Sequence, residues 1–476
     1  MTISSGRCTE AFRSLVFFPG ATALAVFVIG NAAFAAPCAS PPAPTSGPLS
    51  CITAVNIPPD ASNSSGKLTS FDISFINTLR SEYLLGDRSN RGVDVIDVNS
   101  KTFKTRYGGA GIFVGFTGNN NTSGPNGVVA FNNCIWAGDG NSTLRQINET
   151  TATIFAAVAT GGSNRLDELA INRWGTQLLG ANNADDPAFA TLFNTDPFCN
   201  RAVSIIGKVS IDTTIMPTGF GLSMEQPFWD DKIGRFTIAV PIIANNPSGC
   251  NYGQNPGAIT CGGAVAYIDP SQVGSTPLVL GAFDQTTLTG VLPLHGCNPN
   301  GNFLGLHGNT LLGCTPNNAP LPNNAFLQVL NVKSQGALGV IGITGADEVY
   351  FNGGGSDDKH GAYWCTGTSG DIGGPTLGVV DGETNFLVTK TPVSSASHSV
   401  ACAGSLIFDP QTGSDTTGNA AKICGGSNGC VAVYKFKAPH DEDEDDEHRE
   451  RHEAGLDVLE DLFGQNAFPS LFAFDN

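Results

Sequence analysis

Apolar and polar residues alternate along most of the chain, and the alternation recurs in a repeated unit. Each unit begins with a short turn that carries an acidic, Asn or His residue and leads into an apolar strand. A second strand follows, often ending in Gly and a polar residue, and a third strand alternates with period two. Alternation of this kind predicts half-buried β-strands. Seven such units begin near residues 71, 125, 167, 225, 299, 347 and 398.

The seven units predict an all-β fold, a seven-bladed β-propeller, with six or eight blades as the alternatives. Successive units start between 42 and 74 residues apart, whereas a four-stranded blade needs roughly 40–50 residues, so the surplus is predicted to be loops. Residues 51–55 are expected to supply a strand that closes the ring against the last blade. Predicted second strands lie at 83–87, 135–139, 177–182, 235–240, 310–314, 361–365 and 405–409, and third strands at 93–97, 264–269, 326–330 and 430–434.

The N-terminal residues 1–35 have the features of a secretory signal peptide. Arg7 and Arg13 give a basic start, residues 15–30 are apolar, and Ala33-Phe34-Ala35 fits the small-residue cleavage rule. The alternative is an uncleaved membrane anchor, but Pro19-Gly20 interrupts the short apolar stretch and favours cleavage. We therefore expect a secreted or periplasmic protein with an N-terminal extension at 36–69, the propeller at 70–438 and a tail at 439–476.

The cysteine content supports an exported chain. Of 13 Cys residues, Cys8 leaves with the signal, and the remaining 12 form an even set that favours disulfides over metal sites. Local spacing predicts Cys38–Cys51, Cys250–Cys261, Cys297–Cys314 and Cys424–Cys430. Four cysteines then remain to pair among themselves, namely Cys134, Cys199, Cys365 and Cys402.

Charge narrows the range of partners. The net charge is −18, and no basic residues cluster, so nucleic acid is not expected as a partner. Much of the negative charge lies in the tail, where residues 441–447 are seven consecutive acids, typical of a solvated spacer. Apolar residues at 456–463 can form a helical stripe beyond the spacer. This segment is a candidate to dock on the propeller or on a partner, and a recognition tail for export is the alternative.

The turns that begin the repeats carry the candidate chemistry. In a propeller these turns surround one mouth of the central channel, so their side chains are expected to converge. Oxygen ligands that converge on one point suit Ca²⁺ or another hard divalent ion. The alternative is that Asp and Asn serve there only as turn residues. The candidates are Asp72, Asn126, Asp167, Glu168, Glu225, Asn300, Asp347, Glu348 and His398.

Several short motifs resemble two known propeller families. Met224-Glu225-Gln226-Pro227-Phe228-Trp229-Asp230 resembles the Glu-Gly-Pro-x-Trp strand of the regucalcin and gluconolactonase family, and Pro299-Asn300-Gly301 and Pro125-Asn126-Gly127 resemble its Pro-Asn-Gly turn. That resemblance implies a divalent metal held by Glu225, Asn300 and an Asp, either Asp347 or Asp167, in a site that opens lactones. Separately, residues 85–90 with 93–97 resemble YVTN-type bacterial surface propellers, which implies a binding role.

Two functions follow as hypotheses. The first is a scaffold that binds a small molecule or a protein at the funnel. The second is a divalent-metal-dependent lactonase or esterase, with Glu225, Asp347 and His398 as catalytic residues and Glu225, Asn300, Asp347, Asp167 and Asn126 as metal ligands. His398 is the one His at a repeat start and would serve as general base or ligand, although a hydrogen-bonded structural His is the alternative.

Overall fold

The computed structural model describes residues 35–45, 47–219, 224–244, 262–314, 326–353 and 361–437. The expected signal region, the pair Cys250–Cys261 and the acidic tail with its docking segment lie almost entirely outside these residues. The regular secondary structure of the described chain is almost entirely β-strand, with one α-helix, α1 (Asn419–Cys424), and three short 3₁₀ turns, η1 (Asn120–Thr122), η2 (Pro270–Gln272) and η3 (Leu306–Gly308). None of the helices described is long and apolar enough to cross a bilayer.

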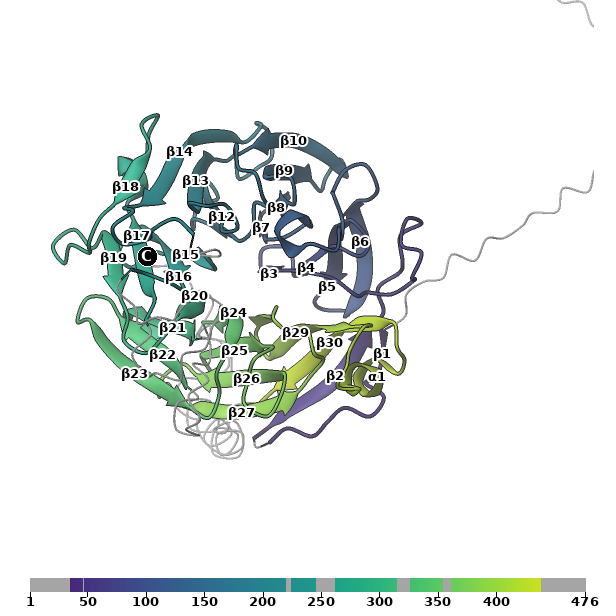
Figure 1. Ribbon diagram of the computed structural model, residues 1–476. Helices are drawn as coiled ribbons and strands as arrows, with labels where there is room; N and C mark the ends of the chain where they lie inside the picture. The colour runs from purple at the N-terminus through teal and green to yellow at the C-terminus, as the bar shows by residue number, and fades with distance from the viewer. Residues whose placement is uncertain are drawn as a thin grey trace, which may run out of the picture. The chain divides into compact units, whose positions relative to one another are not determined.

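The strands form seven sheets around a ring, antiparallel except for one added edge strand, as the seven repeats predict (Figure 1). Blade 1 consists of β3 (Ser74–Asn77), β4 (Glu82–Asp87), β5 (Gly92–Asp97) and β6 (Thr102–Gly108). Blade 2 consists of β7 (Val128–Phe131), β8 (Cys134–Asp139), β9 (Thr143–Asn148) and β10 (Thr153–Ala159). Blade 3 consists of β11 (Leu169–Ile171), β12 (Gln177–Asn182), β13 (Phe189–Asn194) and β14 (Ser204–Ile211).

Blades 4 to 6 follow the same order from the innermost strand outwards. Blade 4 consists of β15 (Pro227–Asp230), β16 (Arg235–Val240), β17 (Ala264–Ile268) and β19 (Gly290–Pro293). Blade 5 consists of β20 (Pro299–Leu304), β21 (Asn309–Cys314), β22 (Phe326–Asn331) and β23 (Gly336–Ile341). Blade 6 consists of β24 (Ala346–Asn352), β25 (Tyr363–Thr368), β26 (Thr376–Asp381) and β27 (Leu387–Pro392). The long insertion after residue 225 is not only loop, because its β18 (Leu278–Leu280) pairs in parallel with β14 of blade 3.

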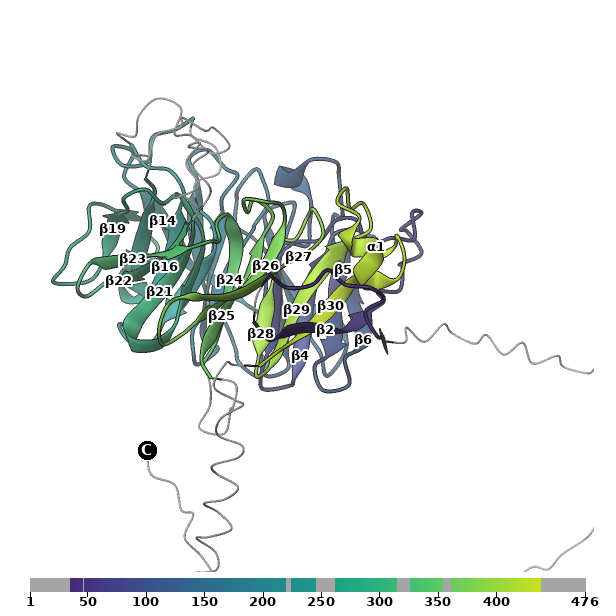
Figure 2. The same cartoon turned by 90° about the horizontal axis from the view of Figure 1, so that it is seen from below.

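Blade 7 joins the two ends of the propeller. Its inner strands are β28 (Ala401–Ala403), β29 (Leu406–Thr412) and β30 (Gly429–Phe436), and its outer strand β2 (Leu49–Val55) comes from the N-terminal segment, with β1 (Ala35–Ala36) beside it. Residues 51–55, expected as a closing strand, lie in β2, which pairs antiparallel with β30. The helix α1 packs against β30 and β2 (Figure 2). Because β2 completes the sheet of blade 7, the N-terminal and C-terminal parts of the propeller are hydrogen-bonded to each other within one blade.

The hydrophobic core lies between neighbouring blades rather than at one centre. The second strands are buried along nearly their whole length, as in β4 and β8, because a blade lies on each side of them. Separate clusters of buried side chains join blades 1 and 2, blades 2 and 3, blades 3 and 4, blades 4 and 5, and blades 5 and 6. A larger cluster joins blades 6, 7 and 1 and includes residues of β2. This arrangement keeps the channel free for polar side chains.

The Gly residues at the ends of the second strands permit neighbouring blades to approach closely. A Cβ at Gly86 would lie 2.4 Å from the carbonyl oxygen of Asn126, and one at Gly138 would lie 2.3 Å from that of Leu166. In both pairs the neighbour is the turn that begins the next repeat. The repeated Gly is therefore a packing requirement that positions the turns around the channel.

Gly138→Ala tests this role. We expect the substitution to lower the free energy of unfolding by about 1–3 kcal/mol, because the new methyl group overlaps backbone and the blade must shift. The measurement is urea unfolding followed by far-UV circular dichroism. Gly281→Ala is the matched control, since a Cβ there meets nothing within 4 Å, and it should change the stability by less than about 0.5 kcal/mol. Equal effects for both substitutions would contradict the packing role.

Five disulfides occur among the described residues. The predicted pairs Cys38–Cys51, Cys297–Cys314 and Cys424–Cys430 are confirmed. The four cysteines that spacing left unassigned form two further pairs. Cys134–Cys199 links blade 2 to blade 3, and Cys365–Cys402 links blade 6 to blade 7. These two pairs connect neighbouring blades, which is why local spacing could not assign them.

Candidate functional site

Backbone hydrogen bonds hold the polar turns at one mouth of the channel. Asp72, Asn126, Asp167 and Glu225 each donate the backbone N–H to a carbonyl on the second strand of the same blade, at 2.7–2.9 Å. The residue after the polar position bonds to the next blade in three cases, as where Gln226 donates to the carbonyl of Asn300 at 3.1 Å. The turns therefore belong to the rigid frame of the ring, and their side chains are fixed in direction.

Six of the predicted residues line one polar pocket of about 260 Å³. They are Asp72, Asp167, Glu168, Glu225, Asp347 and His398. Asn126, Asn300 and Glu348 do not line this pocket. The convergence that the repeats predict is therefore present for all the charged candidates except Glu348.

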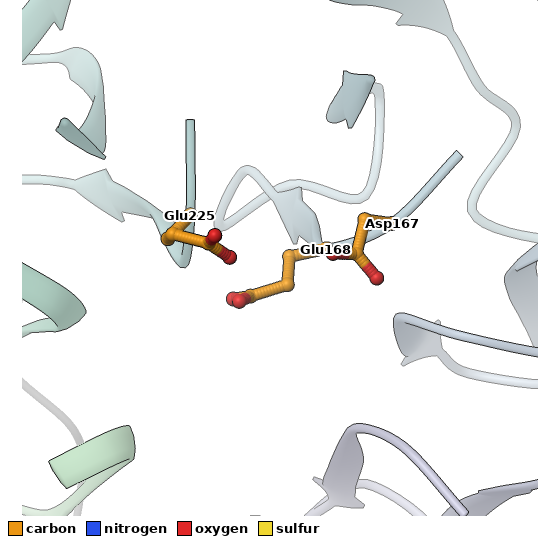
Figure 3. A group of neighbouring side chains, drawn as sticks. All are labelled: Asp167, Glu168 and Glu225. Atoms are coloured by element: carbon orange, nitrogen blue, oxygen red, sulfur yellow. The ribbon is translucent and has the colours of Figure 1, made fainter. Parts of the chain in front are cut away.

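Three carboxyl groups in this pocket form a compact cluster, which we call the carboxylate cluster. Asp167 and Glu168 precede β11 of blade 3, and Glu225 precedes β15 of blade 4. One oxygen from each lies within 4.8 Å of the others, and all three residues are buried. Figure 3 shows the carboxyl group of Glu225 directed towards the other two. Oxygens bound to one Ca²⁺ at 2.3–2.6 Å are at most about 5 Å apart, so the cluster matches the size of a single ion.

Two oxygens of the cluster lack a hydrogen-bond donor. Oδ1 of Asp167 and Oε2 of Glu168 are buried without a partner in the described part of the chain. The other oxygens are better satisfied, since Oδ2 of Asp167 accepts from Arg165 at 2.6 Å and Oε2 of Glu225 accepts from Asn183 at 3.1 Å. A buried acceptor without a donor is costly. The open oxygens therefore mark a position suited to a cation.

The remaining expected ligands have other partners. Oδ1 of Asn126 accepts hydrogen bonds from Nε and Nη2 of Arg88 at 3.0 and 2.7 Å, and its amide donates to the carbonyl of Leu166 at 2.9 Å. The amide of Asn300 donates to Oδ1 of Asp347 at 3.1 Å. Asp347 lines the pocket but lies outside the carboxylate cluster. The cluster thus contains Glu225 and Asp167 of the expected ligand set and adds Glu168.

Two buried arginines in the pocket were missed by sequence reasoning. Arg88 pairs with Asp72, and Arg165 bridges Asp167 at 2.6 Å and Asp72 at 3.8 Å. Both side chains are only 5% exposed, so each guanidinium depends on these carboxylates for its neutralisation. An Arg beside a turn is normally solvent-exposed, and only its position next to a repeat start, as in Arg165-Leu166-Asp167, could have indicated this role.

Both ring nitrogens of His398 lie near oxygen atoms, and one face of the ring packs against an aromatic side chain. Nδ1 lies 2.7 Å from the carbonyl oxygen of Ala396, Nε2 lies 3.4 Å from Oδ1 of Asp72, and the ring stacks on Phe71. Burial alone would lower the pKa of His398, but the contact with Asp72 and the charge of Asp347 outweigh burial and raise it. Oxygen acceptors beside both ring nitrogens favour the protonated form of the ring, so this geometry favours a structural and electrostatic role over a general base.

Burial also sets the protonation of the acids. Burial raises the pKa of Asp167 to about 7 and raises the pKa values of Glu168 and Glu225 well above the ordinary range, and neighbouring carboxylates add to the effect. Asp72 behaves in the opposite way, because the Arg88 guanidinium overcomes burial and holds its pKa well below the ordinary value. The cluster therefore carries protons near neutral pH unless a cation replaces them.

Comparison with known proteins identifies the fold but not a family. No family model matches the chain, and a search of curated proteins gives no match. Among solved structures, a chain of a mitotic checkpoint complex is 10% identical with a TM-score of 0.49, covering 90% of this chain and 99% of that one. A chain of Kuenenia stuttgartiensis hydrazine synthase is 9% identical with a TM-score of 0.52, covering 78% and 96%. At such identities the likeness concerns the fold alone, and the chain is a seven-bladed, disulfide-bonded β-propeller.

Proposed function

We propose that the protein is an exported binding propeller whose channel holds a divalent cation, with Ca²⁺ the best-matched ion. Asp167, Glu168 and Glu225 would supply carboxylate oxygens, and the ion would complete the site for a small polar ligand. The observation that carries this proposal is the carboxylate cluster, with two buried oxygens that lack a donor. Carboxylates are hard ligands, and the cluster contains no nitrogen or sulfur donor, which favours Ca²⁺ or Mg²⁺ over softer metals.

Export is part of the same proposal. Five disulfides occur among the described residues, and two of them join neighbouring blades. Disulfides form and persist mainly in oxidising compartments. A signal peptide at 1–35 and cleavage after residue 35 would place the mature chain in the periplasm or outside the cell.

Hydrolysis of a lactone or ester is the second candidate function. It is favoured by one observation: Glu225, which the gluconolactonase-like motif marks as a metal ligand, lies in the carboxylate cluster, and Asp347 lines the same pocket. Binding without turnover ranks first because both ring nitrogens of His398 are engaged. A screen of lactones and aryl esters with Ca²⁺-loaded protein distinguishes the two, since turnover that a chelator abolishes would establish the hydrolase.

Thermal unfolding with Ca²⁺ and with EGTA at pH 6 and pH 8 tests the cation site. At a hundredfold excess over Kd, Ca²⁺ should raise the free energy of unfolding by about 2.7 kcal/mol. The gain at a fixed Ca²⁺ concentration should be larger at pH 8, because the ion must displace the protons that burial holds on Asp167, Glu168 and Glu225.

The chelated protein should show the opposite trend with pH. Asp167 has a pKa of about 7 in the folded state against an ordinary value of 3.8 for Asp, so the native state binds the additional proton between these pH values. Stability without metal should therefore fall as the pH rises from about 4 to 7. Absence of any shift with Ca²⁺, Mg²⁺ or Mn²⁺ at either pH would contradict the cation site.

A further inference from the structure

The other mouth of the channel carries a second pocket, of about 290 Å³, whose walls are largely apolar and include six aromatic side chains. Four rings on the innermost strands form a continuous arc, which we call the aromatic arc: Phe75, Phe228, Phe303 and Tyr350. Neighbouring ring centroids in this arc are 4.3 Å apart for Phe228 and Phe303, 4.8 Å for Phe303 and Tyr350, and 6.0 Å for Phe75 and Tyr350. The rings come from β3, β15, β20 and β24, so four different blades build the arc.

The repeat places the aromatic arc at a fixed distance from the polar layer. Each ring lies three residues after the polar residue of its unit, as Phe75 follows Asp72 and Phe228 follows Glu225. Phe303 and Tyr350 follow Asn300 and Asp347 in the same register. Three residues of strand span about 10 Å, so the channel has a polar mouth and an aromatic mouth separated by one layer. Blades 2 and 3 place the smaller Val129 and Ala170 in this register, which leaves space beside the rings.

Two carboxyl groups form the floor of the aromatic pocket. Glu168 and Glu348 both line it, and their side chains are 3% and 1% exposed. Oε2 of Glu168 and Oε1 of Glu348 lack a donor within the described ranges. Gln226 donates to the other oxygen of Glu348 at 3.4 Å and to the carbonyl of Val349 at 2.9 Å, which fixes the Glu348 carboxyl at the floor. The described residues that line this pocket include no Lys, Arg or His.

We propose that this aromatic pocket binds a small organic ammonium ion, with the cationic head against the aromatic arc and the two floor carboxylates. Ring faces attract a cation through their quadrupole, and the attraction is strongest for a weakly hydrated alkylammonium that loses little on leaving water. Oε2 of Glu168 and Oε1 of Glu348 are the acceptors that the cationic head would contact, and a bound cation favours the ionised form of both carboxyl groups. The volume lies at the lower end for small-molecule sites, which suits a ligand the size of a trimethylammonium head with a short chain.

The proposal goes beyond the cation cluster and does not depend on it. Glu168 borders both pockets, whereas Glu348 and the aromatic arc belong to the aromatic one. Binding of the ammonium ion is therefore measured in EGTA. The result then does not depend on whether the carboxylate cluster binds a divalent cation.

Isothermal titration of the full-length protein with choline and with 3,3-dimethyl-1-butanol tests the proposal. The two probes have the same shape, and only choline carries a charge. We expect choline to bind roughly tenfold or more tightly than the neutral alcohol, because the charge makes the cation–π and carboxylate contacts. Equal affinities, or no binding of choline, would overturn the proposal.

Two variants locate the binding. Glu348→Gln keeps the shape of the floor and should weaken choline roughly tenfold while leaving the neutral alcohol within about twofold. Phe303→Leu keeps an apolar wall without a ring and should also weaken choline. Glu383→Gln is the matched control, since the Glu383 side chain is 63% exposed beside His307 and lies outside the channel. Melting temperatures in the same buffer verify folding. Choline affinity unchanged in both channel variants would overturn the proposal.

Discussion

Glu225→Gln should remove most of the stabilisation of the protein by Ca²⁺. The substitution preserves the shape of the side chain and removes one of three charges from the carboxylate cluster, so Ca²⁺ affinity should fall by about 100-fold or more. At a Ca²⁺ concentration that gives the wild type about 2.7 kcal/mol, the variant would then gain only about 0.4 kcal/mol. Urea unfolding with Ca²⁺ and with EGTA measures both values.

The same experiment in EGTA separates loss of binding from loss of folding. Glu225 is buried beside other acids, and burial raises its pKa well above the ordinary range, so a neutral amide should leave the chelated protein at least as stable. Glu383→Gln, an exposed Glu outside the channel, should retain the full Ca²⁺ response. A Glu225→Gln variant that retained wild-type Ca²⁺ stabilisation would refute the assignment of this residue as a ligand.

Removal of the Cys134–Cys199 bridge should have the largest effect on stability. The bridge spans 65 residues and joins β8 of blade 2 to the segment after β13 of blade 3. Chain-entropy arguments give a loss of about 4 kcal/mol for a loop of this length. Cys134→Ser with Cys199→Ser is therefore expected to lower the free energy of unfolding by about this amount, measured by urea unfolding in EGTA.

The Cys424–Cys430 bridge provides the comparison, because its cysteines are only six residues apart and lie within blade 7. The same arguments give about 2 kcal/mol for its removal. If removing Cys134–Cys199 lowered the free energy of unfolding no more than removing Cys424–Cys430, the stabilising link between blades 2 and 3 would be contradicted.

The strand pattern was sufficient to predict the architecture. Second strands expected at 83–87, 135–139 and 235–240 correspond to β4, β8 and β16 within one residue at each end. They are identifiable because a strand buried on both faces is apolar throughout and because its terminal Gly contacts the next blade. The parallel pairing of β18 with β14 was missed, since a three-residue strand that joins another blade has no local signal.

The site was predictable only in part, for a physical reason. Each unit begins with a turn at the same mouth of the channel, so the convergence of Asp167, Glu225 and Asp347 follows from the repeat. Which oxygens remain open depends on partners from other blades, such as Asn183 for Glu225 and Arg88 for Asn126. Such pairings depend on side-chain packing between blades, so the sequence of a single repeat unit does not predict them. The sequence did contain a pattern for the aromatic arc, because an aromatic residue lies three residues after the polar residue in four of the units. Aromatic residues in strands usually pack in the hydrophobic core, so this pattern alone did not indicate a pocket.

An anomalous difference map from crystals soaked in Mn²⁺ tests the central claim most directly. The account predicts one strong peak in the channel, within about 2.0–2.6 Å of oxygens from Asp167, Glu168 and Glu225. The peak should be absent from crystals of Glu225→Gln treated in the same way. A map without a peak among these three carboxyl groups, or with the ion bound elsewhere in the channel, would contradict the proposed cation site.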